Sequence, residues 1–454
     1  MPATMIGESG PFQKTNRSAY LNFLRSKYEM YTGETRVQSR PYYLTLEPSD
    51  VCQLRCPTCV TGVENEMRKQ KDADAVIYRS KRTMLSHDFF DALLDEIGEY
   101  LFLIVFYNFG EPLLNKDLPG LIRKAKALNI ETDVNTNLSL PVSDERIEDL
   151  LTSGLDYLYC SIDGFSQETY QVHRVGGDFG LVKKNLERIV KTRDRLALKT
   201  CITYNFLVFG FNEHEAIEAE RYCSDLGINF NTRDAFIHNR DWLPSYRKAE
   251  APRVVPEAVA LPPGFGHKED TTNLAWSPLP DIDDSHAPPR CEWHYGYSAM
   301  TAGGAVTPCC AVPKQEDDFG TVVPGQTTFG DIWNGDRIST ARAAFAGSEP
   351  AGITPVDTVC TRCPVPRFVH HLYSLHDFKV IGQFNNTFKG ADPVLEQAFD
   401  LVSRARYGVG RDELFPQGEF HAPAQIFGTE SAGRDDMARF LQFFETHFIA
   451  PARG

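Results

Sequence analysis

The chain has 454 residues, of which 42% are hydrophobic, so it is long enough for a large buried core and for more than one domain. Its formal charge of -14 argues against a nucleic-acid partner, which normally meets a basic face, and favours a simple role in solubility. The longest apolar run, residues 101–107, is too short to span a bilayer, and residues 1–18 contain no apolar signal core, so we expect a cytoplasmic protein without a membrane partner.

The N-terminal stretch, residues 1–41, is polar and aromatic. Within it the sequence predicts a helix over 18–30 that carries Tyr20, Leu21, Phe23 and Leu24. We interpret this stretch as a packing extension. A short apolar strand follows it at 42–46.

Three cysteines then stand close together in one loop, at Cys52, Cys56 and Cys59. Thiolates are soft ligands, so zinc and iron-sulfur clusters are the leading occupants. A zinc site usually pairs two close cysteines with a second close pair elsewhere, whereas this spacing leaves a cube cluster with three protein ligands and one open iron. The loop therefore favours a cluster over zinc, and unliganded core cysteines are the weakest interpretation. The grouping of the eleven cysteines, without an export signal, also indicates metal ligation rather than disulfides.

The next part of the chain alternates between predicted strands and helices. Residues 64–82 are charged and lack clear periodicity, which we interpret as a lid or a solvated loop. Ser86 predicts the N-cap of a helix that runs to about residue 100. Strands follow at 102–107, 130–135, 157–162, 198–204 and 228–232, with helices at 118–128, 144–153, 180–192 and 213–226. Together with the strand before Cys52 they make six β/α units, which predicts a parallel sheet with right-handed crossovers and an incomplete barrel.

Polar side chains stand where these strands end, the edge at which barrel enzymes carry their chemistry. Glu111 follows the second strand and is able to bind an ammonium group, although a turn with an incidental acid is equally compatible. Asn135 and Asn137 end the third strand; their amides suit ribose hydroxyls or simply cap a turn. Ser161 and Asp163 end the fourth strand, and Asp163 is equally suited to cap the helix that follows.

Two further positions continue this edge. Arg174 lies in a turn with Gly176 and Gly177, and its guanidinium offers a bidentate fork for a carboxylate, with a surface arginine as the alternative. Arg233 and Asp234 end the sixth strand, which makes them candidates for a catalytic substrate pocket, although ordinary ion pairing explains them as well. We expect the isolated cysteines to be small buried side chains: Cys160, Cys201 and Cys223.

A second group of cysteines follows the Pro-rich linker at 239–290: Cys291, Cys309, Cys310, Cys360 and Cys363. A zinc site with four cysteine ligands fits this spacing as well as a cluster does. Residues 366–454 contain no cysteine and include aromatic-rich helical stretches, notably 435–448. We expect this extension to pack over the barrel, with an oligomer contact as the alternative.

The C-x3-C-x2-C spacing after the first strand resembles that of the radical S-adenosylmethionine (SAM) enzymes. The resemblance implies a [4Fe-4S] cluster on Cys52, Cys56 and Cys59, whose open iron is chelated by the amino and carboxylate groups of SAM. One electron then splits the sulfonium, and the resulting 5'-deoxyadenosyl radical takes a hydrogen atom from the substrate. The catalytic help expected of the protein is positioning and the exclusion of water.

The same resemblance implies roles for the strand-end residues. Glu111 would hold the SAM amino group and Arg174 its carboxylate, and the other SAM contacts would be Asn135, Asn137, Ser161 and Asp163. The chain departs from the family pattern in three places, because Phe109 and Leu138 replace glycines and Thr58 replaces an aromatic residue.

The later cysteines resemble the SPASM or "twitch" domain that many radical SAM enzymes carry. This implies an auxiliary [4Fe-4S] cluster on Cys291, Cys309, Cys360 and Cys363, with Cys310 as a competing ligand. A cluster with four protein ligands would not bind substrate directly and would more naturally carry an electron.

We therefore expect an α/β fold with a partial (β/α)6 TIM-like barrel, a small C-terminal auxiliary-cluster domain and a helical C-terminal extension. The expected divisions are 1–41, 42–238, 239–290, 291–365 and 366–454. The expected function is a radical SAM oxidoreductase that oxidises an alcohol of a sugar or aminocyclitol, by analogy with single-auxiliary-cluster dehydrogenases. Its expected partners are a small-molecule substrate and an electron donor such as a flavodoxin or ferredoxin. The alternatives are a peptide-modifying maturase, an epimerase in which Cys310 returns a hydrogen atom, and a zinc-bound structural protein.

Overall fold

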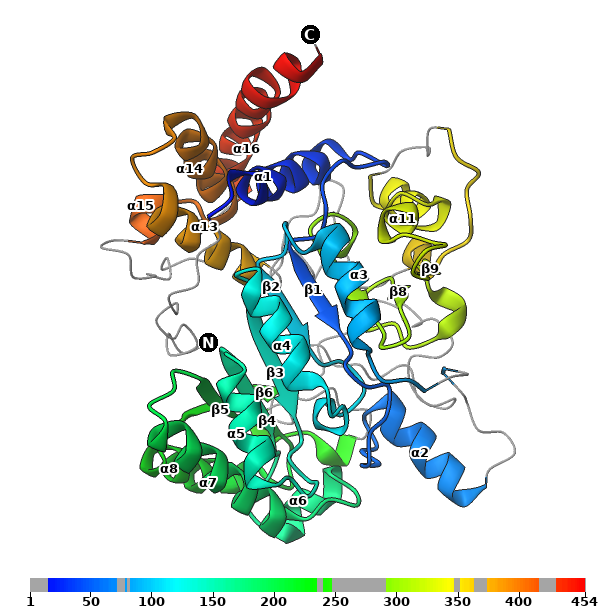
Figure 1. Ribbon diagram of the computed structural model, residues 1–454, viewed down its shortest axis with the longest axis vertical. Coiled ribbons are helices and arrows are strands. Elements are labelled where there is room, and N and C mark those ends of the chain that lie inside the picture. The colour runs from blue at the N-terminus through cyan, green and yellow to red at the C-terminus, as the bar shows by residue number, and fades with distance from the viewer. Residues whose placement is uncertain are drawn as a thin grey trace.

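The computed structural model describes residues 15–71, 78–79, 82–234, 240–246, 291–346, 352–362, 374–415 and 430–453 (Figure 1). The expected linker therefore lies mostly outside the described residues, as does Cys363.

One sheet runs through the described part of the chain, with nine strands in the order β6-β5-β4-β3-β2-β1-β7-β8-β9. The first six strands pair in parallel with their sequence neighbours, as predicted. Because the two edge strands do not pair with each other, the barrel is open rather than closed. The parallel strands are β1 (Tyr43–Leu46), β2 (Leu103–Phe106), β3 (Glu131–Thr136), β4 (Tyr157–Ser161), β5 (Cys201–Val208) and β6 (Asn229–Asp234).

Helices connect these strands, and most of them lie against one face of the sheet (Figure 1). Several of them begin at a side-chain cap. The hydroxyl of Ser86 accepts the N–H of Phe89, as the sequence predicted, and the carboxylate of Asp178 accepts that of Leu181. The helices are α2 (Val60–Gln70), α3 (His87–Ile97), α4 (Leu118–Ala127), α5 (Asp144–Thr152), α6 (Gln167–His173), α7 (Phe179–Arg195) and α8 (Ala216–Asp225).

The two faces of the sheet differ in polarity because side chains alternate along each strand. The face under the helices is apolar and buried, with Val134, Leu158, Cys160 and Phe206 at 0% exposure. The opposite, concave face carries the polar residues of the same strands, such as Asn135 and Asn205. The alternation thus separates a packing face from a face able to bind a polar ligand.

The C-terminal cysteine segment continues the barrel sheet. Its first strand, β7 (Tyr297–Met300), pairs in parallel with β1, with Tyr43 opposite Tyr297, and β8 (Ala305–Thr307) and β9 (Gly320–Thr321) add antiparallel to it. The helices α10 (Phe329–Trp333) and α11 (Asp336–Ala346) follow. The second cysteine group is therefore held at the β1 edge of the barrel.

The first described helix packs against the C-terminal helices (Figure 1). Helix α1 (Arg17–Thr32) contacts α13 (Ser374–Phe388), α14 (Pro393–Tyr407) and α16 (Glu430–Phe444), and α15 (Arg411–Leu414) packs on α13 and α14. Between them Lys27 is fully buried, with its Nζ 2.8 Å from both Glu292 and Asp377. The predicted extension helix at 18–30 is confirmed, as is a helical C-terminal extension.

Two details differ from the prediction. The charged stretch after the cysteine loop, interpreted as a lid or loop, begins with helix α2, so that interpretation is wrong for residues 64–70. Strand β5 lies at Cys201–Val208, four residues beyond the predicted end at 204. Among the described helices, none is long and apolar enough to cross a membrane.

Candidate active site

The cysteine loop lies between β1 and α2 and is held by backbone and amide contacts. The N–H of Arg55 donates to the carbonyl of Val175 at 2.9 Å, and the Asn65 amide donates to the carbonyls of Cys52 and Leu54, each at 2.9 Å. Gly62, in the first turn of α2, packs so close that a Cβ there would lie 2.2 Å from the carbonyl oxygen of Cys56. Only glycine fits this position, so the loop is set against the helix start.

Each sulfur of the loop accepts a hydrogen bond. Cys52 accepts from the N–H of Leu54 and, at 3.7 Å, from the Asn137 amide; Cys56 accepts from Arg174 at 3.9 Å. Cys59 accepts from the backbone N–H groups of Thr61 and Gly62 at the beginning of α2. Hydrogen bonds to the ligand sulfurs are the usual second layer around an iron-sulfur cluster.

The loop fits a cluster better than a single metal ion. Burial raises the pKa of Cys52 to about 12 and that of Cys56 to about 11, so a bound metal is needed to keep these sulfurs ionised near neutral pH. In the described part of the chain, no three His, Cys, Asp or Glu side chains are placed to hold one metal ion. Sulfurs that share one zinc must meet at bonds of about 2.3 Å, whereas those on a cube bind separate irons and lie farther apart.

Glu111 is buried at 1% exposure, and its carboxylate braces the end of β3. It accepts hydrogen bonds from the N–H groups of Leu113 at 2.9 Å and Asn137 at 2.8 Å, and from the Thr136 hydroxyl at 2.6 Å. Burial raises its pKa against these donors. A carboxylate has about four acceptor positions, so roughly one remains for an ammonium group.

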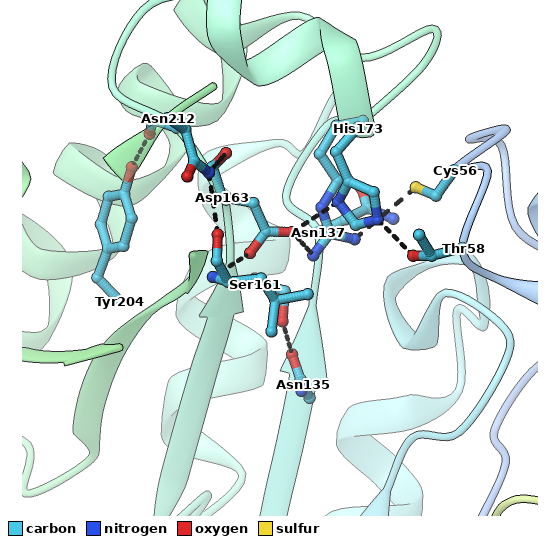
Figure 2. Close-up of polar contacts among 12 residues, drawn as sticks. Cys56, Thr58, Asn135, Asn137, Ser161, Asp163, His173, Tyr204 and Asn212 are labelled. Carbon is cyan, nitrogen blue, oxygen red and sulfur yellow. Dashed lines mark hydrogen bonds and ion pairs between the residues drawn. The ribbon is translucent and has the colours of Figure 1, made fainter. Parts of the chain in front are cut away.

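The two predicted asparagines, Asn135 and Asn137, lie at different heights along the direction of the strands. The Oδ1 of Asn137 accepts from the side chain of Gln53 at 2.8 Å, which ties the end of β3 to the cysteine loop. Asn135 points to the concave face and accepts from the hydroxyl of Ser161 at 2.7 Å (Figure 2). Asn137 is thus beside the sulfurs, and the Asn135–Ser161 pair is deeper in the sheet.

A continuous polar chain connects the fourth strand to the cysteine loop (Figure 2). Asp163, fully buried with a left-handed φ of 61°, contacts His173 at 3.0 Å, and the other ring nitrogen of His173 lies 2.7 Å from the Thr58 hydroxyl. Although burial opposes ionisation, Arg174, His173 and the N–H of Leu207 together lower the pKa of Asp163. Burial lowers the pKa of His173. Thr58, which replaces the family's aromatic residue, is therefore part of this chain.

Arg174 joins Asp163 to Cys56. Its NH2 lies 2.6 Å from the Asp163 carboxylate, and although burial opposes its charge, that carboxylate and Cys56 raise its pKa. Its Nε is buried and has no hydrogen-bond partner within the described ranges. A buried unpartnered N–H beside the cluster loop fits an anionic group such as the SAM carboxylate.

The second cysteine group is only partly described. Cys291 and Cys360 are buried, Cys309 and Cys310 are half-buried in the turn after β8, and Cys363 lies outside the described residues. Cys310 interacts electrostatically with Tyr43 and Tyr107, two residues of the barrel strands or their ends. The thiol of Cys310 therefore lies on the side of this turn that is nearer to the barrel strands.

The predicted catalytic candidates end β6. Arg233 is exposed and interacts electrostatically with Tyr107 and Asp133 across the concave face. Asp234 pairs with Val208 in the sheet, and its side chain is outside the description. Of the isolated cysteines, Cys160 and Cys223 are buried as expected, whereas Cys201 is half-buried and accepts from the Asn229 amide at 3.1 Å.

Sequence reasoning gave no role to Gln53 or His173, although both contact predicted site residues. The available signal was their position, since Gln53 follows Cys52 and His173 precedes Arg174.

Comparison with known proteins identifies two matching family models. The radical SAM superfamily model matches residues 46–223, and the SPASM model, described as an iron-sulfur cluster-binding domain, matches residues 291–364. These domains imply [4Fe-4S] clusters and SAM as cofactors.

Curated relatives are distant. The chain is 26% identical over 325 residues to a PqqA peptide cyclase of Gluconobacter oxydans, covering 68% of this chain and 80% of that protein. It is 24% identical over 188 residues to a probable GTP 3',8-cyclase of Methanococcus maripaludis, covering 41% of this chain and 56% of that protein.

Among solved structures, BtrN in complex with AdoMet and 2-DOIA shares 13% identity at a TM-score of 0.36, covering 68% of this chain and 88% of that one. The anSMEcpe structure with bound AdoMet and Cp18Cys peptide shares 15% identity at a TM-score of 0.38, covering 73% and 88%. With the cysteine loop, the open α/β barrel and both family models in agreement, this chain is a radical SAM enzyme with a C-terminal SPASM-type domain.

Proposed function

We propose that this chain is a radical SAM oxidoreductase that removes hydrogen from an alcohol carbon of a small polar substrate, a sugar or an aminocyclitol. The finer part of this proposal, the reaction and the substrate class, rests on the chemistry of the concave face.

The observation that carries it is the polar lining of that face. Ser161, Asn205 and Asn231 stand opposite one another on β4, β5 and β6, and the amide of Asn231 donates to the Oδ1 of Asn205 at 2.9 Å. Ser161 donates in turn to Asn135. Hydroxyls and amides in such a row both donate and accept, which suits a ligand with several hydroxyl groups.

In this proposal Cys52, Cys56 and Cys59 hold the cluster that binds SAM. Glu111 and Arg174 bind its amino and carboxylate groups, Asn137 lies beside them, and Asp163 acts by positioning Arg174. The auxiliary cluster on Cys291, Cys309 or Cys310, Cys360 and Cys363, when bound, would supply a one-electron acceptor. A flavodoxin or ferredoxin in the cytoplasm would supply the reducing electron.

Arg233 and Asp234 remain our candidates for substrate contacts at the barrel mouth. The division of the chain at 42–238, 239–290 and 291–365 also remains our proposal.

A second candidate function is peptide modification. It is favoured by one observation, the similarity over 325 residues to a protein named as a peptide cyclase. An epimerase would need a hydrogen donor, for which Cys310 is our candidate because it interacts with Tyr107 at the end of β2.

The deciding experiment follows deuterium from substrate to 5'-deoxyadenosine. Enzyme reconstituted anaerobically is incubated with SAM, a reductant and carbon-deuterated sugars, aminocyclitols or peptides. Deuterated 5'-deoxyadenosine together with a ketone product from an alcohol supports the oxidoreductase. Label transfer from peptides alone overturns the small-molecule assignment, and recovery of an epimer carrying solvent hydrogen identifies an epimerase.

A further inference from the structure

A carboxylate in the middle of β3 has no role in the binding of SAM or of the cysteine loop described above. Asp133 stands opposite Val105 of β2 and Tyr157 of β4. Alternation along the strand places it on the concave face with Asn135, because Val134 between them is buried at 0% exposure. Asp133 therefore lies on the polar face of the open barrel, one step below the Asn135–Ser161 pair.

Asp133 has an electrostatic partner on another strand of the sheet. It interacts with Arg233 of β6, although β4 and β5 separate β3 from β6 in the sheet. Two charges on such distant strands influence each other across the concave side of a curved sheet. Tyr107, the residue after β2, interacts with the same pair, so polar groups from three neighbouring parts of the sheet influence one another on this face.

One oxygen of this carboxylate lacks a partner. Asp133 Oδ1 is inaccessible to solvent and accepts no hydrogen bond from any residue in the described ranges. Lys379 of α13 does not fill this role, since its Nζ lies 2.9 Å from the carboxylate of Glu131. A buried carboxylate oxygen without a donor is costly, and a ligand that brings an N–H or O–H group removes that cost.

Both positive and negative side chains act on Asp133. Burial raises its pKa to about 7, and Lys379 and Arg233 oppose this effect while Glu131 and Asp156 add to it. The uncharged titratable groups that face it are Tyr43, Tyr107 and Tyr159. The carboxylate is therefore divided between its two protonation states near neutral pH, and a cationic ligand would favour the ionised one.

We propose that Asp133 is the anchor of the substrate site, and that its Oδ1 accepts a hydrogen bond from an ammonium group of an amine-bearing alcohol. The inference deepens the proposed function, on which it rests, by giving the substrate a positive charge. Helix α13 closes the N-terminal end of the barrel through the Lys379–Glu131 pair, so the ligand enters from the strand ends that carry the cysteine loop.

The test measures binding to the reconstituted, SAM-loaded enzyme by calorimetry with three probes of one shape. They are trans-4-aminocyclohexanol, trans-1,4-cyclohexanediol and trans-4-hydroxycyclohexanecarboxylate. We expect the amine to bind more tightly than the diol and the carboxylate not to bind. Asp133→Asn should weaken amine binding by about ten- to a hundredfold and remove its advantage over the diol.

The control is Asp149→Asn on helix α5, which removes an exposed carboxylate that pairs with Arg123 and should leave the preference for the amine unchanged. The amine stays cationic below about pH 9, so its affinity for the wild type should fall as the pH drops through Asp133's titration near 7, and Asp133→Asn should abolish this dependence.

Equal affinities of wild type for amine and diol, absence of amine binding, or an unchanged preference in Asp133→Asn overturns the inference. Formation of 5'-deoxyadenosine without substrate tests the proposed function separately. Wild type that binds the amine but never cleaves SAM disproves the radical chemistry and leaves the site standing, whereas cleavage without amine preference disproves the site alone.

Discussion

Arg174 lies 2.6 Å from the carboxylate of Asp163, and the same guanidinium reaches the sulfur of Cys56 at 3.9 Å. The two residues of this ion pair flank α6, since Asp163 lies between β4 and the helix and Arg174 follows the helix. The backbone of Asp163 is left-handed, and its carboxylate contacts both His173 and Arg174. The charge at the end of β4 thereby fixes the arginine that stands beside the cluster loop.

Replacing Asp163 by Asn tests this arrangement with little backbone cost, because Asn tolerates the left-handed conformation. The change leaves Arg174 without its buried counter-ion, and we expect the free energy of unfolding to fall by about 3–5 kcal/mol at neutral pH. Asp149→Asn is the control, because Asp149 pairs with Arg123 at the exposed surface. Chemical unfolding of both variants measures the difference.

The pH dependence of this effect has a definite sign. The pKa of Asp163 is lowered in the folded state, so its stabilising contribution is complete above the unfolded value of about 3.9 and is lost as the pH falls through the folded value. The gap between wild type and Asp163→Asn should therefore shrink in acid. A gap that stays constant would contradict the ion pair.

Cys56→Ala should abolish the reductive cleavage of SAM. The sulfur is buried, accepts a hydrogen bond from Arg174 and is one of the three ligands that we propose for the cluster, so its loss would leave the cluster with two. Chromatography of 5'-deoxyadenosine and iron analysis provide the measurement. Cys160→Ala, a buried cysteine on β4 outside the loop, should retain both.

Cys360→Ala should distinguish the roles of the two proposed clusters. We expect SAM cleavage to remain measurable, because Cys360 belongs to the C-terminal group, while oxidation of the substrate stops. The assay compares 5'-deoxyadenosine with product in one reaction. Full product formation by this variant would refute the role of electron acceptor.

Local signals accounted for much of the fold. The cap at Ser86 was predictable because its hydroxyl acts on an N–H three residues away, and the alternation of strands and helices follows from periodicity within each element. Helix α2 was missed because its buried positions include Thr61, Gly62 and Glu64 rather than a stripe of apolar residues. Glu64 is instead held by Arg68 and Arg82.

Contacts between distant parts of the chain had no local signal. The pairing of β1 with β7 joins Tyr43 to Tyr297, and nothing near either residue in the sequence specifies the other. The hydrogen bond between Thr58 and His173 is of the same kind. The cysteine spacing made the first cluster site a candidate from the sequence alone because its residues are neighbours in sequence, whereas Asp133 became a candidate only when its surroundings were known.

Lys27→Met tests the buried ion pairs that join helix α1 to Glu292 and to Asp377 of helix α13. Lys27 is fully buried between Glu292 and Asp377, and both carboxylates also pair with Arg406. Removing one of the two cations leaves a buried excess of negative charge, so we expect a loss of about 3–5 kcal/mol in unfolding free energy. Lys389→Met removes an exposed pair with Asp412 and should cost less than about 1 kcal/mol. Similar losses in both variants would contradict the buried network.

The free energy of unfolding should fall in mild acid because His294 stays neutral in the folded protein. The side chain is 1% exposed, its ring lies edge-on to Phe345, and burial together with the nearby Arg342 lowers its pKa to about 3. Below the unfolded value of about 6.5 only the unfolded chain takes up a proton at this residue, so stability falls as the pH falls.

The expected loss from His294 is about 1 kcal/mol between pH 6.5 and 5.5, and His294→Gln should remove that part of the slope. His447→Gln is the control, because His447 is exposed in the π-helical turn that follows α16. Chemical unfolding at the two pH values measures the change. Because the neutral form is imposed by burial and by Arg342, a slope unaffected by His294→Gln would mean that this histidine is protonated in the folded protein and has a partner for its charge.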